Sequence, residues 1–400
     1  MIQSASYSVN TDARRYSILL VLSALMSFAS ISTDLYLPAI PTIASDLHAD
    51  VGSIEFTISA YLIGFSLGQL FWGPLSDQYG RRLPIIAGIV LFILGSAGCA
   101  LAGSVPSIIF FRVIQALGAC ANVVLSRAIV RDLYIGNDAA KMLSTLMTIM
   151  AVAPLIGPSV GGAILYFGDW RNIFEALVLI GALTLLAMKN FPETLSPVLR
   201  ERQNMKGVLT TYLSLIKNRR FMGYALTSGA FYGGMFAYIA GTPYAYISYY
   251  HVSPQLYGVL FGSGIVGIMI ANQVNAKLVT KFGINRLILI GALIAAASGA
   301  LLILNIFNSL SGLYGLVFGL FIFVSCTGLI VANAIAGALS SAENNTGSAS
   351  ALIGVFQYGA GIFGSGLVGI FANGTLWPMV LVIACSAFIT LYWATVAHEH

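Results

Sequence analysis

The chain has 400 residues, of which 58% are hydrophobic and only 8% are charged. Soluble globular domains carry about 25% charged residues, so this composition excludes a soluble globular protein. We therefore expect a chain embedded in lipid. Its formal net charge of +5 then reflects orientation in a membrane with an anionic inner leaflet, not nucleic-acid binding.

Apolar runs of about 20 residues recur along the whole chain, each long enough at about 1.5 Å per residue to cross roughly 30 Å of hydrocarbon as a helix. The runs are apolar on every face, which favours helices over barrel strands. We predict an all-α membrane protein with twelve transmembrane helices. The predicted spans start near Ser17, Ser53, Pro84, Ser107, Met142, Asn172, Phe221, Pro254, Arg286, Ser311, Gly347 and Thr375.

Lys and Arg gather in the loops on one side of the predicted membrane. Arg14 and Arg15 precede the first span, and Arg81 and Arg82 follow the second. Short loops rich in Lys and Arg stay in the cytoplasm. Both termini are therefore expected to be cytoplasmic.

The longest polar stretch, "PETLSPVLRERQNMKG", separates the sixth and seventh spans. It divides the chain into an N-terminal six-helix bundle (residues 1–190), a cytoplasmic linker (191–218) and a C-terminal six-helix bundle (219–400). A weak repeat supports this division, because "GPLSDQYGRRLP" and "AKLVTKFGINRL" align with Gly80 over Gly283. Two similar six-helix halves around a midplane cavity are typical of alternating-access carriers. No metal site, cofactor site or nucleotide-binding loop is predicted.

The segment "GPLSDQYGRR" joins the second and third spans. An acid in such a short loop can meet an Arg or a helix N-terminus in one conformation and lose it in another. The alternative is a loop whose Arg residues only anchor to lipid phosphate. The gating candidates here are Gly73, Asp77, Gly80, Arg81 and Arg82.

Asp34 and Arg112 are ionisable residues within apolar runs. An Arg at a helix centre costs about 2.5 to 3.5 kcal/mol, so we expect Arg112 to have a partner unless it extends to the membrane surface. Counted from the span ends, Asp34 and Arg112 lie at similar depth in the outer third. We predict that Asp34 couples transport to protons and that Arg112 tunes it; a structural ion pair is the alternative. Asp34 is the only acid that we place deep in a span, which favours neutral or zwitterionic substrates.

The fifth span contains "APLIGPSVGG", with two prolines and three glycines. Prolines remove backbone hydrogen bonds and glycines allow close helix approach. A structural kink alone would also explain this composition. The conformational candidates in this motif are Pro154, Gly157, Pro158, Gly161 and Gly162.

Aromatic and amide side chains in several spans could line an apolar cavity for a neutral or weakly polar ligand. Each could instead pack between helices or face lipid. The candidates are Tyr36, Gln115, Asn122, Phe236, Tyr238, Tyr244, Asn272, Asn333 and Gln357.

Four segments resemble one known family. "GPLSDQYGRR" resembles the signature loop of the major facilitator superfamily, and Arg112, Gln115 and Gly118 resemble its span-four motif. "GPSVGG" resembles the Gly-Pro-x-x-Gly-Gly motif of its exporter branches. "TDLYLPAIP" resembles the opening span of the bicyclomycin and chloramphenicol resistance (Bcr/CflA) transporters, which are drug:proton antiporters.

The resemblance implies the major facilitator fold of two pseudo-symmetric six-helix bundles. It also implies a proton-coupled multidrug exporter of the bacterial inner membrane, not an enzyme, for substrates such as chloramphenicol- or bicyclomycin-like drugs. We expect a monomer, because twelve spans with an internal pore need no partner chain. The exporter's partners would be the drug, protons and the bilayer, with the proton gradient in place of a cofactor. The alternative is a proton-coupled importer or exporter of a small metabolite on the same fold.

Overall fold

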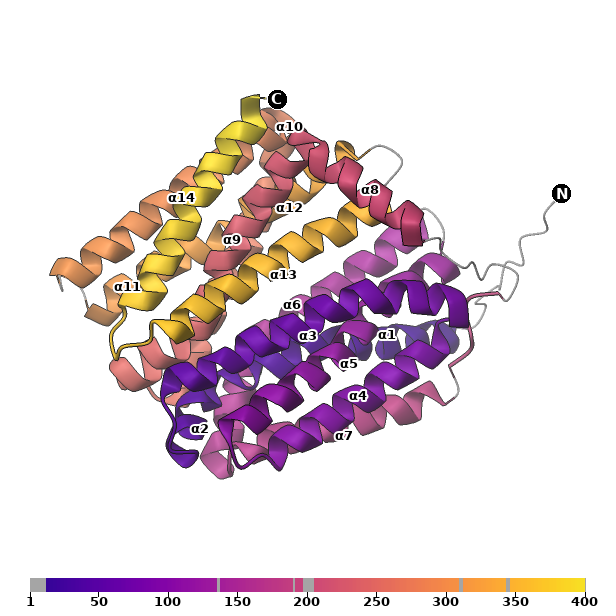
Figure 1. The fold of residues 1–400 in the computed structure, drawn as a ribbon, viewed down its shortest axis with the longest axis horizontal. Coiled ribbons are helices and arrows are strands. Elements are labelled where there is room, and N and C mark those ends of the chain that lie inside the picture. The colour runs from indigo at the N-terminus through magenta and orange to yellow at the C-terminus, as the bar shows by residue number, and fades with distance from the viewer. Residues whose placement is uncertain are drawn as a thin grey trace.

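The computed structural model describes residues 12–134, 137–189, 191–196, 205–308, 312–342 and 346–399. All regular elements in these residues are helical. Figure 1 shows two groups of long helices side by side, one from each half of the chain.

The first group holds α1 (Asp12–Asp34), η1 (Leu37–Ala39), α2 (Ile40–Asp46), α3 (Val51–Tyr79), α4 (Arg82–Ala100), α5 (Val105–Leu133), α6 (Asn137–Phe167) and α7 (Arg171–Met188). The second group holds α9 (Arg219–Pro243), η3 (Tyr244–Tyr249), α10 (Pro254–Asn308), α11 (Gly312–Ser325), α12 (Thr327–Ser340), α13 (Thr346–Ile370) and α14 (Trp377–Glu399). Between the groups lies α8 (Met205–Lys217), inside the predicted linker, of which residues 197–204 lie outside the described part.

Nine apolar helical segments in the described residues are long enough to span a membrane. The longest, Pro254–Phe307, bends at Gly283 and therefore provides two spans. With α6 and α9 this gives the twelve predicted helices, and the all-α membrane fold is confirmed. The predicted start at Ser311 lies outside the described residues; α11 begins at Gly312.

Gly80 and Gly283 turn the chain at equivalent places in the two halves. Gly80 has φ 89° and ψ 172°, and Gly283 has φ 74° and ψ 164°. Essentially only glycine occupies this region of backbone space. The predicted repeat thus aligns two residues with the same conformation.

The two halves meet along two helix pairs. α3 packs antiparallel to α13: Gly52 lies against Gly369, and the Ser59 and Ser365 hydroxyls lie 2.8 Å apart. α6 packs antiparallel to the part of α10 that precedes the bend at Gly283, with Gly162 against Pro254. The contacts Gly52–Gly369 and Gly162–Pro254 lie toward one end, which holds α2 and the loop between α13 and α14 and which we call the distal end (Figure 1). The halves are closed against each other there.

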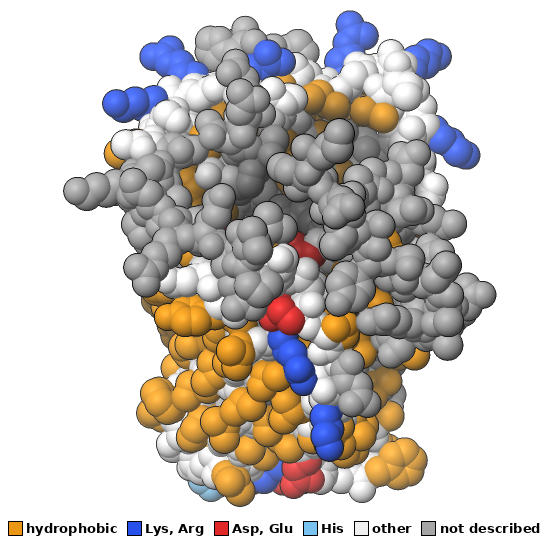
Figure 2. Space-filling view, turned by 90° about the vertical axis from the view of Figure 1, so that its right-hand side faces the viewer, with side chains coloured by type: hydrophobic (Ala, Val, Ile, Leu, Met, Phe, Trp, Pro, Cys, Tyr) orange, Lys and Arg blue, Asp and Glu red, His pale blue; other side chains and the backbone are white. Residues whose placement is uncertain are grey.

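The surface is that of a membrane protein. Leu94, Leu183 and Phe318 are all more than half exposed on the outside of the helices. Figure 2 faces the side from which the N-terminus extends in Figure 1, and shows most of its Lys and Arg side chains along the upper edge and hydrophobic side chains over the lower part. Lipid is the solvent that such a surface requires.

Candidate functional site

The first span is broken at Asp34, the last residue of α1. In a continuous helix the carbonyl of Asp34 would accept a hydrogen bond from the backbone nitrogen four residues later, which belongs to Pro38. Proline has no N–H to donate, so the chain tightens into η1 and resumes as α2. Irregular backbone at membrane depth is tolerated only where protein or an aqueous cavity surrounds it.

The Asp34 carboxylate is buried and forms no salt bridge with the residues that the structure describes. The residue is 6% exposed, and its Oδ2 atom has no hydrogen-bond partner in the described part of the chain. The short helix η1, which follows shortly after Asp34, contacts α9 and α10 of the other half. Asp34 thus lies beside the boundary that must rearrange if the halves move.

The glycines of the fifth span lie directly on this break. A Cβ atom on Gly157 would come within 2.7 Å of the Asp34 Cβ, and one on Gly161 would collide with the carbonyl oxygen of Leu35. Gly162 touches Pro254 of the other half. The motif therefore links the Asp34 backbone to the boundary, while Pro154 and Pro158 lie inside the same helix.

Arg112 is fully buried, so it does not extend to the membrane surface. Its Nη1 donates to the Ser32 carbonyl oxygen at 2.9 Å and to Gln115 Oε1 at 2.7 Å. The guanidinium lies over the rings of Tyr36 and Tyr61, 4.6 and 4.4 Å from their centroids. Its Nε and Nη2 have no hydrogen-bond partner among the described residues.

No direct ion pair joins Asp34 and Arg112 among the described contacts, so this conformation gives no support to the alternative of a structural ion pair. Arg112 instead reaches α1 through the Ser32 carbonyl, two residues before Asp34. Asp34 and Arg112 are therefore connected through the α1 backbone between Ser32 and Asp34.

The side chains that contact Arg112 are themselves fixed by hydrogen bonds. Gln115 Nε2 donates to Ser96 Oγ at 2.7 Å. The Tyr36 hydroxyl lies 2.7 Å from Thr57 Oγ1, and the Tyr61 hydroxyl lies 2.7 Å from Ser32 Oγ. The arginine is thus fixed from α1, α3 and α4.

One predicted cavity residue in the first half lacks partners. The Asn122 amide is fully buried, and neither its oxygen nor its nitrogen has a hydrogen-bond partner in the described part of the chain. It lies beside Gly88 of α4.

An aromatic cluster crosses the boundary between the halves. Phe65 of α3 lies 4.9 Å from Tyr358 of α13, and Tyr358 lies 6.1 Å from Phe236 and 6.2 Å from Tyr232, centroid to centroid. Of these four, only Phe236 was predicted. Phe65, Tyr232 and Tyr358 had no sequence signal beyond aromatic composition.

The other predicted residues of the second half are dispersed. Tyr238 stacks on Phe261 at 5.2 Å. Asn333 Nδ2 donates to Asn275 Oδ1 at 2.6 Å, and Gln357 Nε2 donates to Ser228 Oγ at 2.6 Å, so both join helices within that half. Asn272 is exposed.

The loop after α3 forms a cluster around Arg81. Arg81 Nη1 contacts Asp77 at 2.6 Å, and its Nε contacts Asp132 of α5 at 2.8 Å. Burial lowers the pKa of Arg81, but its hydrogen bonds and charge interactions with Asp132 and Asp77 outweigh that effect and raise it. Asp132 was not predicted as a partner.

A second acid, Glu193, also binds this loop. Its carboxylate accepts from the backbone N–H of Arg81 at 2.8 Å and of Arg82 at 3.1 Å. Burial raises the pKa of Glu193, but the backbone N–H groups of Leu195, Arg81, Arg82 and Thr194 outweigh it and hold the pKa below its ordinary value. Arg82 Nη2 donates to the Lys189 carbonyl, and Gly73 faces open space.

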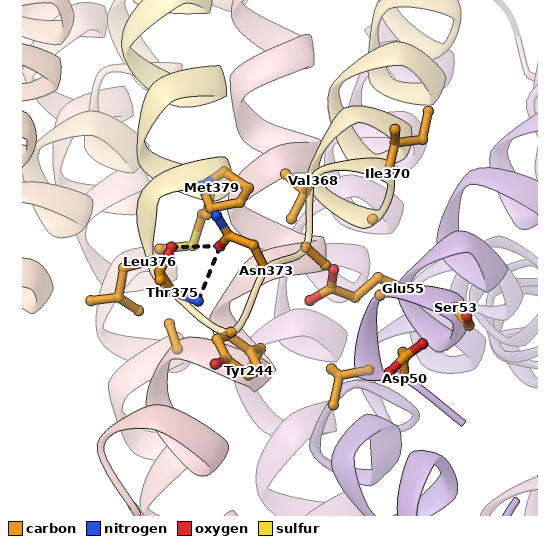
Figure 3. Close-up of a pocket in the computed structure, with 18 of the residues that line it drawn as sticks. Asp50, Ser53, Glu55, Tyr244, Val368, Ile370, Asn373, Thr375, Leu376 and Met379 are labelled. Atoms are coloured by element: carbon orange, nitrogen blue, oxygen red, sulfur yellow. Dashed lines mark hydrogen bonds between the residues drawn. The ribbon is translucent and has the colours of Figure 1, made fainter. Parts of the chain in front are cut away.

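Glu55 is a second buried acid, near the start of a span, that was not singled out from the sequence. Glu55 lies in α3, is 2% exposed, and its Oε2 has no hydrogen-bond partner among the described residues. It lines a cavity of about 530 Å³ at the distal end, together with the predicted residue Tyr244 (Figure 3). The described residues hold no group of three or more side chains suited to a metal ion.

Sequence comparisons agree with this architecture. A family profile described as Major Facilitator Superfamily matches residues 20–365. The uncharacterized MFS-type transporter YdgK of Bacillus subtilis is 37% identical over 385 residues, covering 95% of this chain and 94% of its own. A bicyclomycin resistance protein homolog of Haemophilus influenzae is 30% identical and covers 96% of both chains. A chloramphenicol resistance protein of Pseudomonas aeruginosa is 28% identical, covering 94% of this chain and 90% of its own.

Solved structures show the same fold. The xylose transporter XylE from E. coli superposes with a TM-score of 0.72 at 18% identity, covering 96% of this chain and 97% of that one. The chain therefore belongs to the major facilitator superfamily; it is a multi-pass membrane transporter that needs no bound cofactor, not an enzyme, and it is related to drug:proton antiporters.

Proposed function

We propose that this transporter is a drug:proton antiporter in which Asp34 is the proton-coupling carboxylate. The observation that carries the proposal is the position of Asp34: buried, with an unpartnered oxygen, at a helix break that contacts the boundary between the halves. An ionised carboxylate without a partner is costly to bury. Protonation of Asp34 therefore favours the state in which it is enclosed.

The exchange cycle follows from this cost. Asp34 takes a proton from the periplasm when the halves open at the distal end, and a bound drug is released. The halves then close distally, as they are in this structure, and the proton leaves toward the cytoplasm. Arg112 supports the cycle, because its hydrogen bond to Ser32 couples it to the α1 backbone next to Asp34.

This cycle places the distal end in the periplasm and both termini in the cytoplasm. The positive residues along one edge of the opposite end support that orientation (Figure 2). We also propose the predicted division at residues 1–190, 191–218 and 219–400, and a monomer. The cluster around Arg81 then belongs to the cytoplasmic side, where its ion pairs would rearrange as the halves move.

A proton entering through a membrane potential of roughly 150 mV releases about 3.5 kcal/mol, since 100 mV is worth about 2.3 kcal/mol per charge. That would concentrate a neutral drug outward a few hundredfold. A monocation exchanged for one proton gains nothing from the potential. Because Glu55 lies in a separate distal cavity, the site around Asp34 keeps a single acid, and neutral or zwitterionic substrates remain favoured.

The aromatic cluster of Phe65, Tyr232, Phe236 and Tyr358 supports a ligand with an apolar body. Two relatives are named for bicyclomycin and chloramphenicol resistance. We therefore propose compounds of those two kinds as substrates.

The test is efflux of chloramphenicol and of a cationic dye from energised cells, with and without a protonophore. The intact protein is compared with Asp34→Asn and with the matched control Glu175→Gln, an exposed acid, at equal membrane levels. We expect protonophore-sensitive efflux from the intact protein and the control, and none from Asp34→Asn. Active efflux by Asp34→Asn at the parent rate would show that a residue other than Asp34 couples transport to protons. No chloramphenicol efflux by the intact protein would favour a metabolite as substrate.

A further inference from the structure

The cavity at the distal end is separate from the Asp34 site. It measures about 530 Å³ and is lined by residues of both halves: the start of α3 in the first half, and the end of α9, the end of α13 and the loop before α14 in the second. Ligand pockets of about 300 to 1,000 Å³ hold drug-sized molecules. The cavity is thus large enough for a small organic ligand.

The lining of this cavity is acidic. Asp50 and Glu55 line it, and its described lining contains no Lys, Arg or His. In Figure 3 the Glu55 carboxylate points into the space between Asn373 and Tyr244. Its Oε2 is buried without a hydrogen-bond partner among the described residues. A buried carboxylate without a partner is neutralised either by a proton or by a positive charge beside it, and a cation in this cavity would supply that charge.

Aromatic side chains adjoin the acid. Tyr244 and Phe56 line the same cavity, from η3 and α3 respectively. Aromatic rings attract cations through their faces, and quaternary ammonium groups are bound in this way. The polar Asn373 Oδ1 is already occupied, because it accepts from the backbone N–H and hydroxyl of Thr375. The charged groups of the wall are therefore the carboxylates of Asp50 and Glu55, of which Glu55 is the buried one.

We propose that the distal cavity binds a monovalent organic cation with an apolar or aromatic body. Glu55 balances its charge, and Tyr244 and Phe56 contact its ammonium group or ring. This site goes beyond the proposed export function and does not depend on which drug the central site carries.

Binding at this site has a conformational consequence. The cavity walls come from both halves, so a ligand in it contacts both at once. Opening of the distal end separates α3 from α13, so the ligand loses its contacts with one of the two halves. A ligand shifts an equilibrium by its difference in affinity for the two states. The cation therefore holds the distal end closed and inhibits turnover from this site.

The test measures binding of benzyltrimethylammonium to the purified protein in nanodiscs by calorimetry, with no proton gradient. Its neutral carbon analogue, neopentylbenzene, controls for charge. The variants are Glu55→Gln and Tyr244→Leu, with Glu175→Gln, an exposed acid outside this cavity, as the matched control, and each is first checked for an unchanged unfolding temperature.

We expect saturable binding of the cation, weakened about tenfold or more by Glu55→Gln because one partner of a buried charge pair is lost. Tyr244→Leu should weaken it less, and the control Glu175→Gln should leave it unchanged. Equal binding by folded Glu55→Gln, equal binding of the neutral analogue, or no saturable binding up to about 10 mM would overturn the proposal. Failure of the efflux test leaves these outcomes unaffected, so the two proposals are tested separately.

Discussion

Gly157 of α6 lies so close to Asp34 at the end of α1 that a Cβ atom on the glycine would come within 2.7 Å of the Asp34 Cβ. Four residues later in α6, Gly161 lies against the Leu35 carbonyl in the same way. Small residues at helix contacts let two backbones approach closely. The place of the Asp34 carboxylate is thus set by two glycines of a neighbouring helix.

Gly157→Ala should therefore displace Asp34 and impair coupling. We expect a stability loss of about 1 to 3 kcal/mol, the usual cost of an extra methyl group in a packed interior, together with reduced protonophore-sensitive efflux. Thermal unfolding and efflux at equal membrane levels measure the two effects. Gly359→Ala is the stability control, since a Cβ atom there meets nothing within 4 Å. Unchanged efflux by Gly157→Ala would show that the position of Asp34 tolerates a shift.

Gly80→Ala and Gly283→Ala should each destabilise the protein by about 1 to 3 kcal/mol, because both positions need a conformation that other residues adopt only under strain. A Cβ on Gly283 meets nothing within 4 Å, so the backbone alone supplies the cost there. Gly73, which begins the segment GPLSDQYGRR that also contains Gly80, lies in a helix, and a Cβ atom there would face open space. Gly73→Ala should be neutral or slightly stabilising. Equal unfolding temperatures for all three variants would contradict this prediction.

Most of the fold could be predicted from the sequence because lipid leaves few options for a backbone. A run of apolar residues must form a helix long enough to cross, so its position follows from composition alone. The equivalence of Gly80 and Gly283 was also readable, since each turn requires glycine. Breaks inside a span were harder to predict from the sequence. The helix is interrupted at Cys326, between α11 and α12, and no nearby residue signals that interruption.

The candidate site could be predicted only in part. Asp34 and Arg112 stand out because charge is rare and costly in lipid. Their contacts were not readable, because they depend on how the broken first span rests on α5 and α6. Glu55 was missed because it is the third residue of its predicted run, and its burial comes from the other half of the chain. Asp132 and Glu193 lie 51 and 112 residues from Arg81, beyond any local pattern.

Asp132→Asn should weaken the cluster around Arg81. Arg81 and Asp132 side chains are only 9% and 15% exposed, so the lost charge is poorly replaced by water. We expect a loss of about 1.5 to 3 kcal/mol, typical of a hydrogen bond to a charged group, measured by thermal or denaturant unfolding.

The matched control for this variant is Asp169→Asn. Asp169 pairs with Arg171 at 3.1 Å, but the two side chains are 52% and 34% exposed. Exposed pairs contribute about 0 to 1 kcal/mol, so this control should change little. If both variants lost the same stability, burial would not explain the strength of the Arg81 cluster.

Glu193 should make the stability of this loop depend on pH. The backbone N–H groups of Leu195, Arg81, Arg82 and Thr194 hold its folded pKa below the ordinary value of an unfolded glutamate, about 4.3. A lowered folded pKa means that the ionised carboxylate stabilises the folded protein at neutral pH, and that this contribution is lost as the pH falls from about 4.3 through the folded value. Glu193→Gln should therefore unfold at a lower temperature than the parent at pH 7. The difference should be small, because Glu193 is exposed and water screens it, and it should shrink toward pH 3. A difference that persists unchanged at pH 3 would mean that the glutamate acts by shape and not by charge.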